Sequence, residues 1–244
     1  MTDSIPSSGS TTDRITLITG ASRGIGRALS EHIAGPGHTL VLIATPKSQG
    51  ALEELDDVIT AKGGHAVLVP MDLTQADGID HLGAVLYERF GKLDALAGCA
   101  AHLGPISPIH HIDPKTMDRT FAVNTMANWR LIRSMMPLML LSDSPRAVFL
   151  TDSQADTNQP FWAHYSASKA ALNGIVKTWA EEVKKTPIRA NLFDPGRVAT
   201  RLRRTAMPGE DQSSFHEPES IAPSLAKLIS VDETRHGELI RFTH

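Results

Sequence analysis

The sequence contains little cysteine and no long apolar run. Its one cysteine, Cys99, has no partner for an internal disulfide, and a lone thiol is a poor nucleus for a zinc site. The strongest apolar stretch, residues 135–141, is far shorter than the roughly 20 residues that cross a bilayer. These absences exclude a disulfide-stapled secreted domain and a membrane-spanning protein, so we expect a cytoplasmic location.

An excess of charge of one sign is also missing. The 244 residues carry 24 Lys and Arg against 27 Asp and Glu, a net charge of −3. Nucleic acids and anionic membranes usually bind a one-sided basic surface, which this balance does not predict. The 11 histidines show no metal-binding spacing, and adjacent residues such as His110 and His111 point apart on a regular element. We expect a small-molecule partner, no nucleic-acid or membrane partner, and no metal.

Residues 1–14 are rich in Ser and Thr and lack the basic start and apolar stretch of a secretory signal, so we expect a flexible tail there. After this tail, short apolar runs alternate with longer segments of helical period, a pattern typical of a parallel sheet with crossover helices. Strands are expected at 15–19, 39–44, 66–70, 93–97, 147–151, 188–193 and 238–242, and helices at 25–34, 51–62, 75–90, 115–141, 163–185 and 218–229.

The alternation continues without a linker, which predicts that residues 15–244 form one doubly wound α/β domain. Pro137 should bend or end the helix at 115–141, because proline removes a backbone donor and clashes with the preceding turn. The segment at 194–217 is longer than a structural connection needs to be. It is the candidate substrate loop.

The first predicted strand runs into a glycine-rich turn that contains Gly20, Gly24 and Gly26, and a helix follows. Glycines allow a tight turn and a close approach of backbone N–H groups to a pyrophosphate, while the helix N-terminus supplies partial positive charge. The alternative is an ordinary glycine-rich turn. A nucleotide-hydrolase phosphate loop is disfavoured because no Gly-Lys-Ser/Thr follows.

The turn Thr19-Gly20-x-x-x-Gly24-Ile25-Gly26, taken with Tyr165-x-x-x-Lys169 downstream, resembles the short-chain dehydrogenase/reductase family. The resemblance implies a Rossmann-type, seven-stranded parallel sheet with helices on both faces. It also implies that Tyr165, Lys169 and the helix residue Asn124 are catalytic. The cofactor-binding residues that it implies, together with those chosen below for the cofactor phosphate, are Gly20, Ser22, Arg23, Gly24, Ile25, Gly26, Thr45, Asp72, Leu73, Ala100, Tyr165, Lys169, Pro195, Gly196, Val198 and Thr200.

Tyr165 and Lys169 lie four residues apart in a good helix-forming segment, so they share one face. A nearby cation favours the phenolate, and Lys169 and an oxidised nicotinamide ring are therefore expected to lower the tyrosine pKa. Tyr165 would then exchange a proton with the substrate oxygen while hydride moves to or from the nicotinamide. The alternative is a surface helix pair.

The choice of nicotinamide cofactor depends on the end of the second strand. Enzymes that use NAD place an Asp or Glu about 20 residues after the glycine turn to hold the ribose 2′-OH. This sequence has no acid between Ile43 and Lys47. Arg23 is suited to a phosphate, and Lys47 or the Thr45 hydroxyl could assist it. We therefore predict NADP(H) in preference to NAD(H), with solvated side chains as the alternative for Arg23 and Lys47.

The family also uses a serine, usually about thirteen residues before the tyrosine, that hydrogen-bonds the substrate carbonyl. Counting back from Tyr165, this position falls on Asp152, and Ser153 lies one residue later. An ionised aspartate could not donate to a developing oxyanion. Ser153 is therefore preferred as the catalytic serine, provided that the strand end bends. Thr151 and Asp152 stay open as alternatives.

The leading hypothesis is an NADP(H)-dependent oxidoreductase that reduces a ketone or aldehyde and runs in reverse on an alcohol. A 3-oxoacyl thioester is one candidate substrate, although the C-terminal segment 236–242 lacks the ending common in such reductases. The second hypothesis is a catalytically impaired dinucleotide-binding relative that acts as a sensor or partner protein, because Asp152 departs from the family pattern. Small residues in the helix at 163–185, with the resemblance, predict a homodimer or homotetramer.

Overall fold

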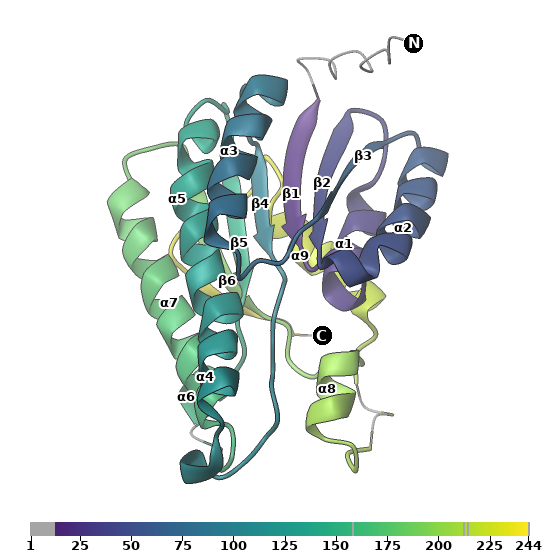
Figure 1. Ribbon diagram of the computed structural model, residues 1–244. Coiled ribbons are helices and arrows are strands. Elements are labelled where there is room, and N and C mark those ends of the chain that lie inside the picture. Colours follow the sequence, from purple (N-terminus) through teal and green to yellow (C-terminus); the bar gives the residue numbers. More distant parts are fainter. Residues whose placement is uncertain (1–12, 158, 212, 214, 244) are drawn as a thin grey trace.

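A single parallel sheet lies between two layers of helices in the computed structural model, which describes residues 13–157, 159–211, 213 and 215–243 (Figure 1). The seven strands are hydrogen-bonded in the order β3-β2-β1-β4-β5-β6-β7. They are β1 (Arg14–Thr19), β2 (His38–Ala44), β3 (His65–Pro70), β4 (Ala95–Gly98), β5 (Arg146–Leu150), β6 (Arg189–Asp194) and β7 (Leu239–Arg241). The doubly wound, seven-stranded α/β fold predicted from the sequence is confirmed.

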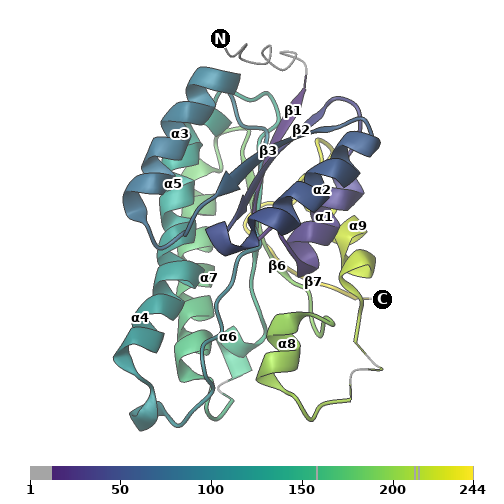
Figure 2. The same cartoon turned by 45° about the vertical axis from the view of Figure 1, so that its right-hand side comes forward.

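Helices cover both faces of this sheet. They are α1 (Gly24–Ile33), α2 (Gln49–Ala61), α3 (Ala76–Phe90), α4 (Pro114–Phe121), α5 (Ala127–Met139), α6 (Gln154–Thr157), α7 (Ala163–Val183), α8 (Arg201–Ala206) and α9 (Pro218–Leu228). The figures show α1, α2 and α9 on one face, and α3, α5 and α7 on the other (Figures 1 and 2). Among the described helices, none is long and apolar enough to cross a membrane.

The core is built by strands that are buried on both faces. Successive residues of a strand point to opposite faces, so Leu17 packs with side chains of α3, α5 and α7, while Ile18 packs with side chains of α1, α2 and α9. Both residues are fully buried. The continuous apolar run of β1 therefore contributes to two cores, as expected of a strand in the interior of the sheet.

The helix predicted at 115–141 differs from the structure. It is interrupted by a turn of π-helix, Ala122–Met126, that separates α4 from α5. Within the turn, the Asn124 carbonyl oxygen accepts a hydrogen bond from the Asn128 side-chain amide at 2.8 Å. Pro137 lies inside α5, which continues past it and ends two residues later at Met139.

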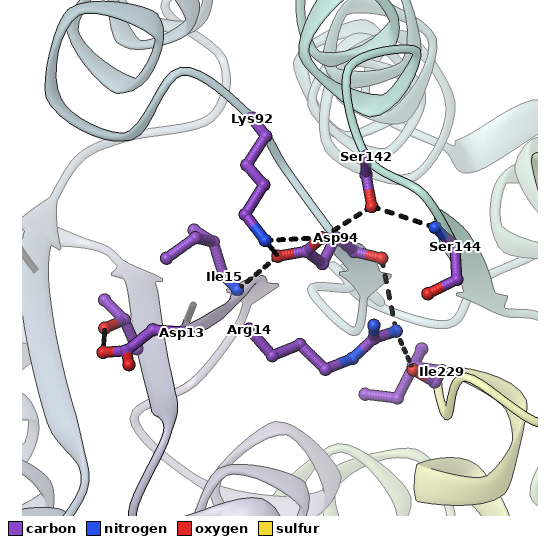
Figure 3. A network of polar contacts seen from close by, with 9 residues as sticks. Asp13, Arg14, Ile15, Lys92, Asp94, Ser142, Ser144 and Ile229 are labelled. Atoms are coloured by element: carbon purple, nitrogen blue, oxygen red, sulfur yellow. Dashed lines mark hydrogen bonds and ion pairs between the residues drawn. The ribbon is translucent and has the colours of Figure 1, made fainter. Parts of the chain in front are cut away.

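The amino-terminal edge of the sheet carries a network of polar contacts around buried Asp94 (Figure 3). Its carboxylate accepts hydrogen bonds from Ile15 N at 2.8 Å and from Ser142 Oγ at 2.5 Å, and pairs with Lys92 Nζ at 3.0 Å. The Arg14 guanidinium donates to the Ile229 carbonyl oxygen at 2.6 Å. Asp13 and Arg14, which the sequence analysis assigns to the tail, are thus part of the fold, and residues 1–12 lie outside the described residues.

The predicted substrate loop at 194–217 contains a short helix, α8. The Thr200 side chain caps this helix by accepting a hydrogen bond from Arg203 N at 3.2 Å. An isolated parallel bridge joins Val198 to His216. The segment is therefore partly ordered by its own contacts, and Figure 2 shows α8 beyond the carboxyl end of the sheet.

Candidate active site

A cleft of about 860 Å³ opens at the carboxyl ends of the strands. It lies beside β1 and β4, where the strand order reverses and where open α/β sheets bind their ligands. All sixteen residues that the sequence analysis assigns to cofactor binding line this cleft. The structure thus brings together side chains that are up to 180 residues apart, from Gly20 to Thr200.

At two of its glycines the turn is packed so closely that a side chain is excluded. A Cβ on Gly26 would lie 2.5 Å from the carbonyl oxygen of Gly20, and a Cβ on Gly20 would lie 2.9 Å from Ala100 Cα. Gly20 and Gly24 also have positive φ angles, 68° and 56°. Helix α1 begins at Gly24, so its first N–H groups face the cleft, and the turn fits a dinucleotide pyrophosphate.

The buried Thr19 side chain joins this turn to the end of β4. Its Oγ1 accepts hydrogen bonds from the backbone N–H groups of Cys99 and Ala100, both at 3.1 Å. Cys99 lines the cleft, but burial raises the pKa of its thiol to about 12, which disfavours the nucleophilic thiolate. Together these contacts hold the backbone of β4 against the cleft.

The far end of the cleft is lined by Arg23, Thr45, Ser48 and Asp72. Arg23 is exposed. Asp72 accepts hydrogen bonds from Thr74 N and Oγ1 at 3.0 and 2.9 Å, and these bonds lower its pKa. Lys47, the other cation considered for a cofactor phosphate, is not among the residues that line the cleft, whereas its neighbour Ser48 is.

The structure places Tyr165 and Lys169 on one face of α7, with both side chains buried. Lys169 Nζ donates a 2.7 Å hydrogen bond to the Leu150 carbonyl oxygen and lies 5.8 Å from the centre of the Tyr165 ring. Burial lowers the pKa of Lys169 to about 8. The tyrosine pKa, which the sequence analysis expects to be lowered, is raised well above 10 by burial and by Asp152.

Asp152 is the partner of the tyrosine hydroxyl. Its Oδ2 accepts a hydrogen bond from Tyr165 Oη at 3.3 Å, and its Oδ1 accepts one from Gln154 N at 2.9 Å. Ser153, the serine preferred from the sequence, is exposed and does not line the cleft. Thr151 Oγ1 is directed to Asn173 Oδ1, at 2.6 Å. Of the three candidates, the structure brings only Asp152 to Tyr165, because β5 ends at Leu150 and a turn follows.

Asn124 is fully buried in the π-helical turn and does not line the cleft. Its side-chain amide bonds both backbone groups of His102, accepting from N at 2.7 Å and donating to O at 2.9 Å. It also donates to Ser168 Oγ at 2.9 Å. In this arrangement Asn124 fixes the chain that follows β4, which forms one wall of the cleft.

The substrate end of the cleft contains residues that sequence reasoning missed. Leu103 and Leu202 line it and belong to an apolar cluster with Trp162, Tyr165 and Ala206. Leu103 comes from the segment after β4, which carries no motif that could reveal it, whereas Leu202 comes from α8, inside the predicted substrate loop at 194–217. The Trp162 ring meets the Tyr165 ring edge to face, with centroids 5.7 Å apart.

The described residues contain no group of three or more His, Cys, Asp or Glu arranged to hold a metal ion. Arg203 lines the cleft but is bound by Glu210 through two 2.7 Å hydrogen bonds, and Arg197 Nη1 lies 3.5 Å from the same carboxylate. The positive charge of this loop is thus partly neutralised within the loop itself.

Comparisons with known proteins agree with this geometry. A family model described as short chain dehydrogenase matches residues 14–211. The chain is 32% identical over 199 residues to the NADPH-dependent aldehyde reductase-like protein, chloroplastic, of Arabidopsis thaliana. The aligned residues cover 78% of this chain and 74% of that protein. It is 31% identical over 234 residues to the A-factor type gamma-butyrolactone 1'-reductase (1S-forming) of Streptomyces virginiae, with 90% and 89% covered.

A solved structure of a short chain dehydrogenase from Shigella flexneri, complexed with NADP, has the same fold. It superposes with a TM-score of 0.88 at 27% sequence identity and covers 94% of this chain and 97% of that one. The likeness therefore extends over nearly the whole of both chains.

Proposed function

Because this chain belongs to the short-chain dehydrogenase family and is an NAD(P)-dependent oxidoreductase, we propose that it uses NADP(H) to reduce a ketone or aldehyde, and to oxidise the alcohol in reverse. The observation that carries the proposal is that Tyr165 lines the same cleft as the glycine turn and has Lys169 Nζ 5.8 Å from its ring centre. The glycine turn would hold the pyrophosphate of a dinucleotide, whose nicotinamide would supply or accept the hydride in the part of the cleft lined by Tyr165.

The choice of NADP(H) is supported by the residues at the far end of the cleft. The exposed guanidinium of Arg23 and the hydroxyls of Thr45 and Ser48 can bind a 2′-phosphate, and Thr45 follows directly after β2, where an acid would select NAD. The Shigella flexneri structure named above is a complex with NADP, which agrees with this choice.

Bound NADPH supplies the hydride, and the protein positions the acceptor and moves the proton. Tyr165 donates its hydroxyl proton to the substrate oxygen as negative charge develops there. Protonated Lys169 stabilises the phenolate left behind. Asn124 holds the backbone of His102 in the cleft wall. The family resemblance implies a second role for Asn124, which is to hold a water that links Lys169 to solvent. Ser153 is exposed and does not line the cleft, so its proposed role requires the turn at 151–153 to rearrange.

The apolar wall formed by Leu103, Leu202 and Trp162 suits a substrate with an apolar body. The names of the two curated relatives, an aldehyde reductase-like protein and a gamma-butyrolactone reductase, support a carbonyl as the reacting group. A 3-oxoacyl thioester remains one candidate of this class.

The small and exposed side chains Ala167, Ala170 and Gly174 form one face of α7, and Met126 and Trp129 at the start of α5 are 39% exposed. Small residues allow two helices to approach closely. We propose that a second copy of the chain packs on this surface to form a homodimer or homotetramer.

Oxidation of NADPH against a panel of ketones, aldehydes and 3-oxo thioesters tests the enzyme proposal, with Tyr165→Phe as the variant. We expect turnover by the wild type and a loss of about 10²- to 10⁴-fold in Tyr165→Phe, with NADPH affinity retained. The competing proposal, a catalytically impaired sensor protein, is favoured by Asp152. It predicts NADPH binding without turnover across the panel.

A further inference from the structure

Asp152 places a carboxylate beside the Tyr165 hydroxyl, at a position where the family resemblance implies a serine hydroxyl. Both carboxylate oxygens accept hydrogen bonds, one from the tyrosine and one from Gln154 N, and the second bond fixes the side chain within its own turn. A hydroxyl can donate to a carbonyl oxygen, whereas a carboxylate only accepts. Beside the tyrosine hydroxyl, this protein therefore has a hydrogen-bond acceptor where the family resemblance implies a hydrogen-bond donor.

The charges around this position do not favour an anion. Asp194 is only 5% exposed, and repulsion from Asp152 helps to raise its pKa. The Arg203 guanidinium, whose charge acts on the tyrosine, is held by Glu210 through two hydrogen bonds. Lys169 is the remaining buried cation, and its Nζ donates to the Leu150 carbonyl oxygen. Arg241 Nε lies 3.8 Å from the Asp194 carboxylate, so both nearby guanidinium groups are paired with carboxylates other than Asp152.

Apolar residues around Tyr165 strengthen the effect of the Asp152 charge. Leu103, Trp162 and Ala206 pack around Tyr165 and are each less than 9% exposed. An apolar wall excludes water, and a charge beside it interacts more strongly with its partners than it would in water. A carboxylate here repels an alkoxide that develops on a carbonyl oxygen and attracts a cation.

We propose that Asp152 selects a substrate whose reacting group is a protonated carbon–nitrogen double bond, so that the enzyme reduces an iminium ion to an amine in preference to a neutral carbonyl. This inference rests on the proposed function, because it uses the same cleft and the same reduced nicotinamide cofactor. In the complex, the iminium N–H donates a hydrogen bond to an Asp152 oxygen.

The step balances without a proton donor. The iminium carbon gains a hydride from the reduced nicotinamide, the electron pair of the C=N π bond becomes the nitrogen lone pair, and the positive charge passes from substrate to cofactor. Reduction of a ketone, in contrast, requires a proton at the alkoxide oxygen. Tyr165 is a weaker acid here than a free tyrosine, because burial and Asp152 raise its pKa. The geometry that hinders the ketone suits the iminium.

The test compares a five-membered cyclic imine, methylpyrroline, with a ketone of similar size, methylcyclopentanone, in the presence of NADPH. We expect the wild type to reduce the imine with a kcat/KM at least about tenfold higher than the ketone. Asp152→Ser restores a hydroxyl and should reverse this preference. Asp152→Asn keeps the shape of the side chain and removes its charge, so it should also lose the preference. Asp156→Ser, which removes an exposed carboxylate of α6, is the matched control and should leave the ratio unchanged.

A binding measurement decides the same question without turnover. Protonated methylpyrrolidine and methylcyclopentanol are titrated into the enzyme that holds NADP⁺, and the amine should bind at least about tenfold more tightly in the wild type but not in Asp152→Ser or Asp152→Asn. Equal binding of amine and alcohol, together with a preference for the ketone, overturns this inference and leaves the proposed reductase intact. Failure to consume NADPH with any carbonyl or imine overturns the proposed function, and the amine titration still decides the role of Asp152.

Discussion

The Lys169 ammonium donates a 2.7 Å hydrogen bond to the carbonyl oxygen of Leu150, the last residue of β5. This bond ties α7 to the end of the strand that leads to Asp152. Because the lysine is only 2% exposed, its charged form is disfavoured and its pKa falls from 10.5 to about 8. Helix α7 is therefore attached to the sheet through an ammonium group whose pKa is about 8.

This burial predicts a pH dependence of stability. Between pH 8 and 10.5 the unfolded chain binds the lysine proton and the folded chain has released it, so Lys169 makes the free energy of unfolding rise with pH. Lys169→Met removes this contribution. We expect the stability of the wild type relative to Lys169→Met to increase by about 2 kcal/mol between pH 7 and pH 9.5, measured by urea unfolding. Lys177→Met, at an exposed position of the same helix, should show no such trend.

The NADP(H) proposal predicts that Arg23 and Thr45 discriminate between the cofactors. Arg23→Ala should weaken NADPH binding by about 10- to 100-fold, because it removes a charge-assisted hydrogen bond to the 2′-phosphate, and it should leave NADH binding unchanged. Thr45→Asp should reverse the preference, since a carboxylate repels the phosphate and binds the ribose 2′-OH. Fluorescence titration with both cofactors measures this, and a wild type that prefers NADH contradicts the assignment.

The packing of Gly26 against the Gly20 carbonyl oxygen predicts a steric effect. A Cβ on Gly26 would lie 2.5 Å from that oxygen, so Gly26→Ala forces the turn apart. We expect a loss of about 2 kcal/mol in the free energy of unfolding and a marked loss of NADPH affinity. Gly50→Ala is the control: this residue lies inside α2, nothing is within 4 Å of its would-be Cβ, and the change should stabilise the helix by about 0.5–1 kcal/mol.

The network around Asp94 predicts a change in stability without a change in chemistry. Asp94→Ala leaves Ile15 N and the Ser142 hydroxyl without their acceptor, so we expect a loss of about 3 kcal/mol. Asp80→Ala breaks a more exposed pair with Arg133 and should cost less than about 1 kcal/mol. At temperatures where the variant is still folded, Asp94→Ala should keep the wild-type KM for NADPH. The reason is that the Asp94 network lies at the amino-terminal edge of the sheet, whereas the cleft lies at the carboxyl edge.

The parts of the site that were predictable from the sequence are those that local chemistry fixes. The glycine turn and the Tyr165–Lys169 pair each lie within a few residues, so a strand, a turn or a helix alone sets their geometry. The assignment of Ser153 depended on where β5 ends. Side-chain alternation stops at Leu150, and the turn that follows brings Asp152, not its neighbour, to the tyrosine.

The remaining differences arise from tertiary contacts. The interruption at Asn124 is supported by a side-chain bond from Asn128 and by bonds to the backbone of His102, which comes from another segment. Leu103 and Leu202 reach the cleft only because two separate segments fold over the same edge of the sheet. No pattern of spacing in a single stretch of sequence contains that information.

The separation of the Asp94 network from the cleft has a consequence for how this enzyme can change. The apolar residues Leu103 and Leu202, which line the cleft, lie at the carboxyl edge of the sheet on segments that follow β4 and β6. At the opposite edge, the hydrogen bond from Ile15 N to the Asp94 carboxylate joins β1 to the start of β4. A variant library directed at α8 therefore leaves that fastening untouched. Substitutions in α8 that change substrate selectivity can therefore accumulate without disturbing the Asp94 network. Stabilising substitutions near that network, found by screening for resistance to heat, can offset the stability that the α8 substitutions cost.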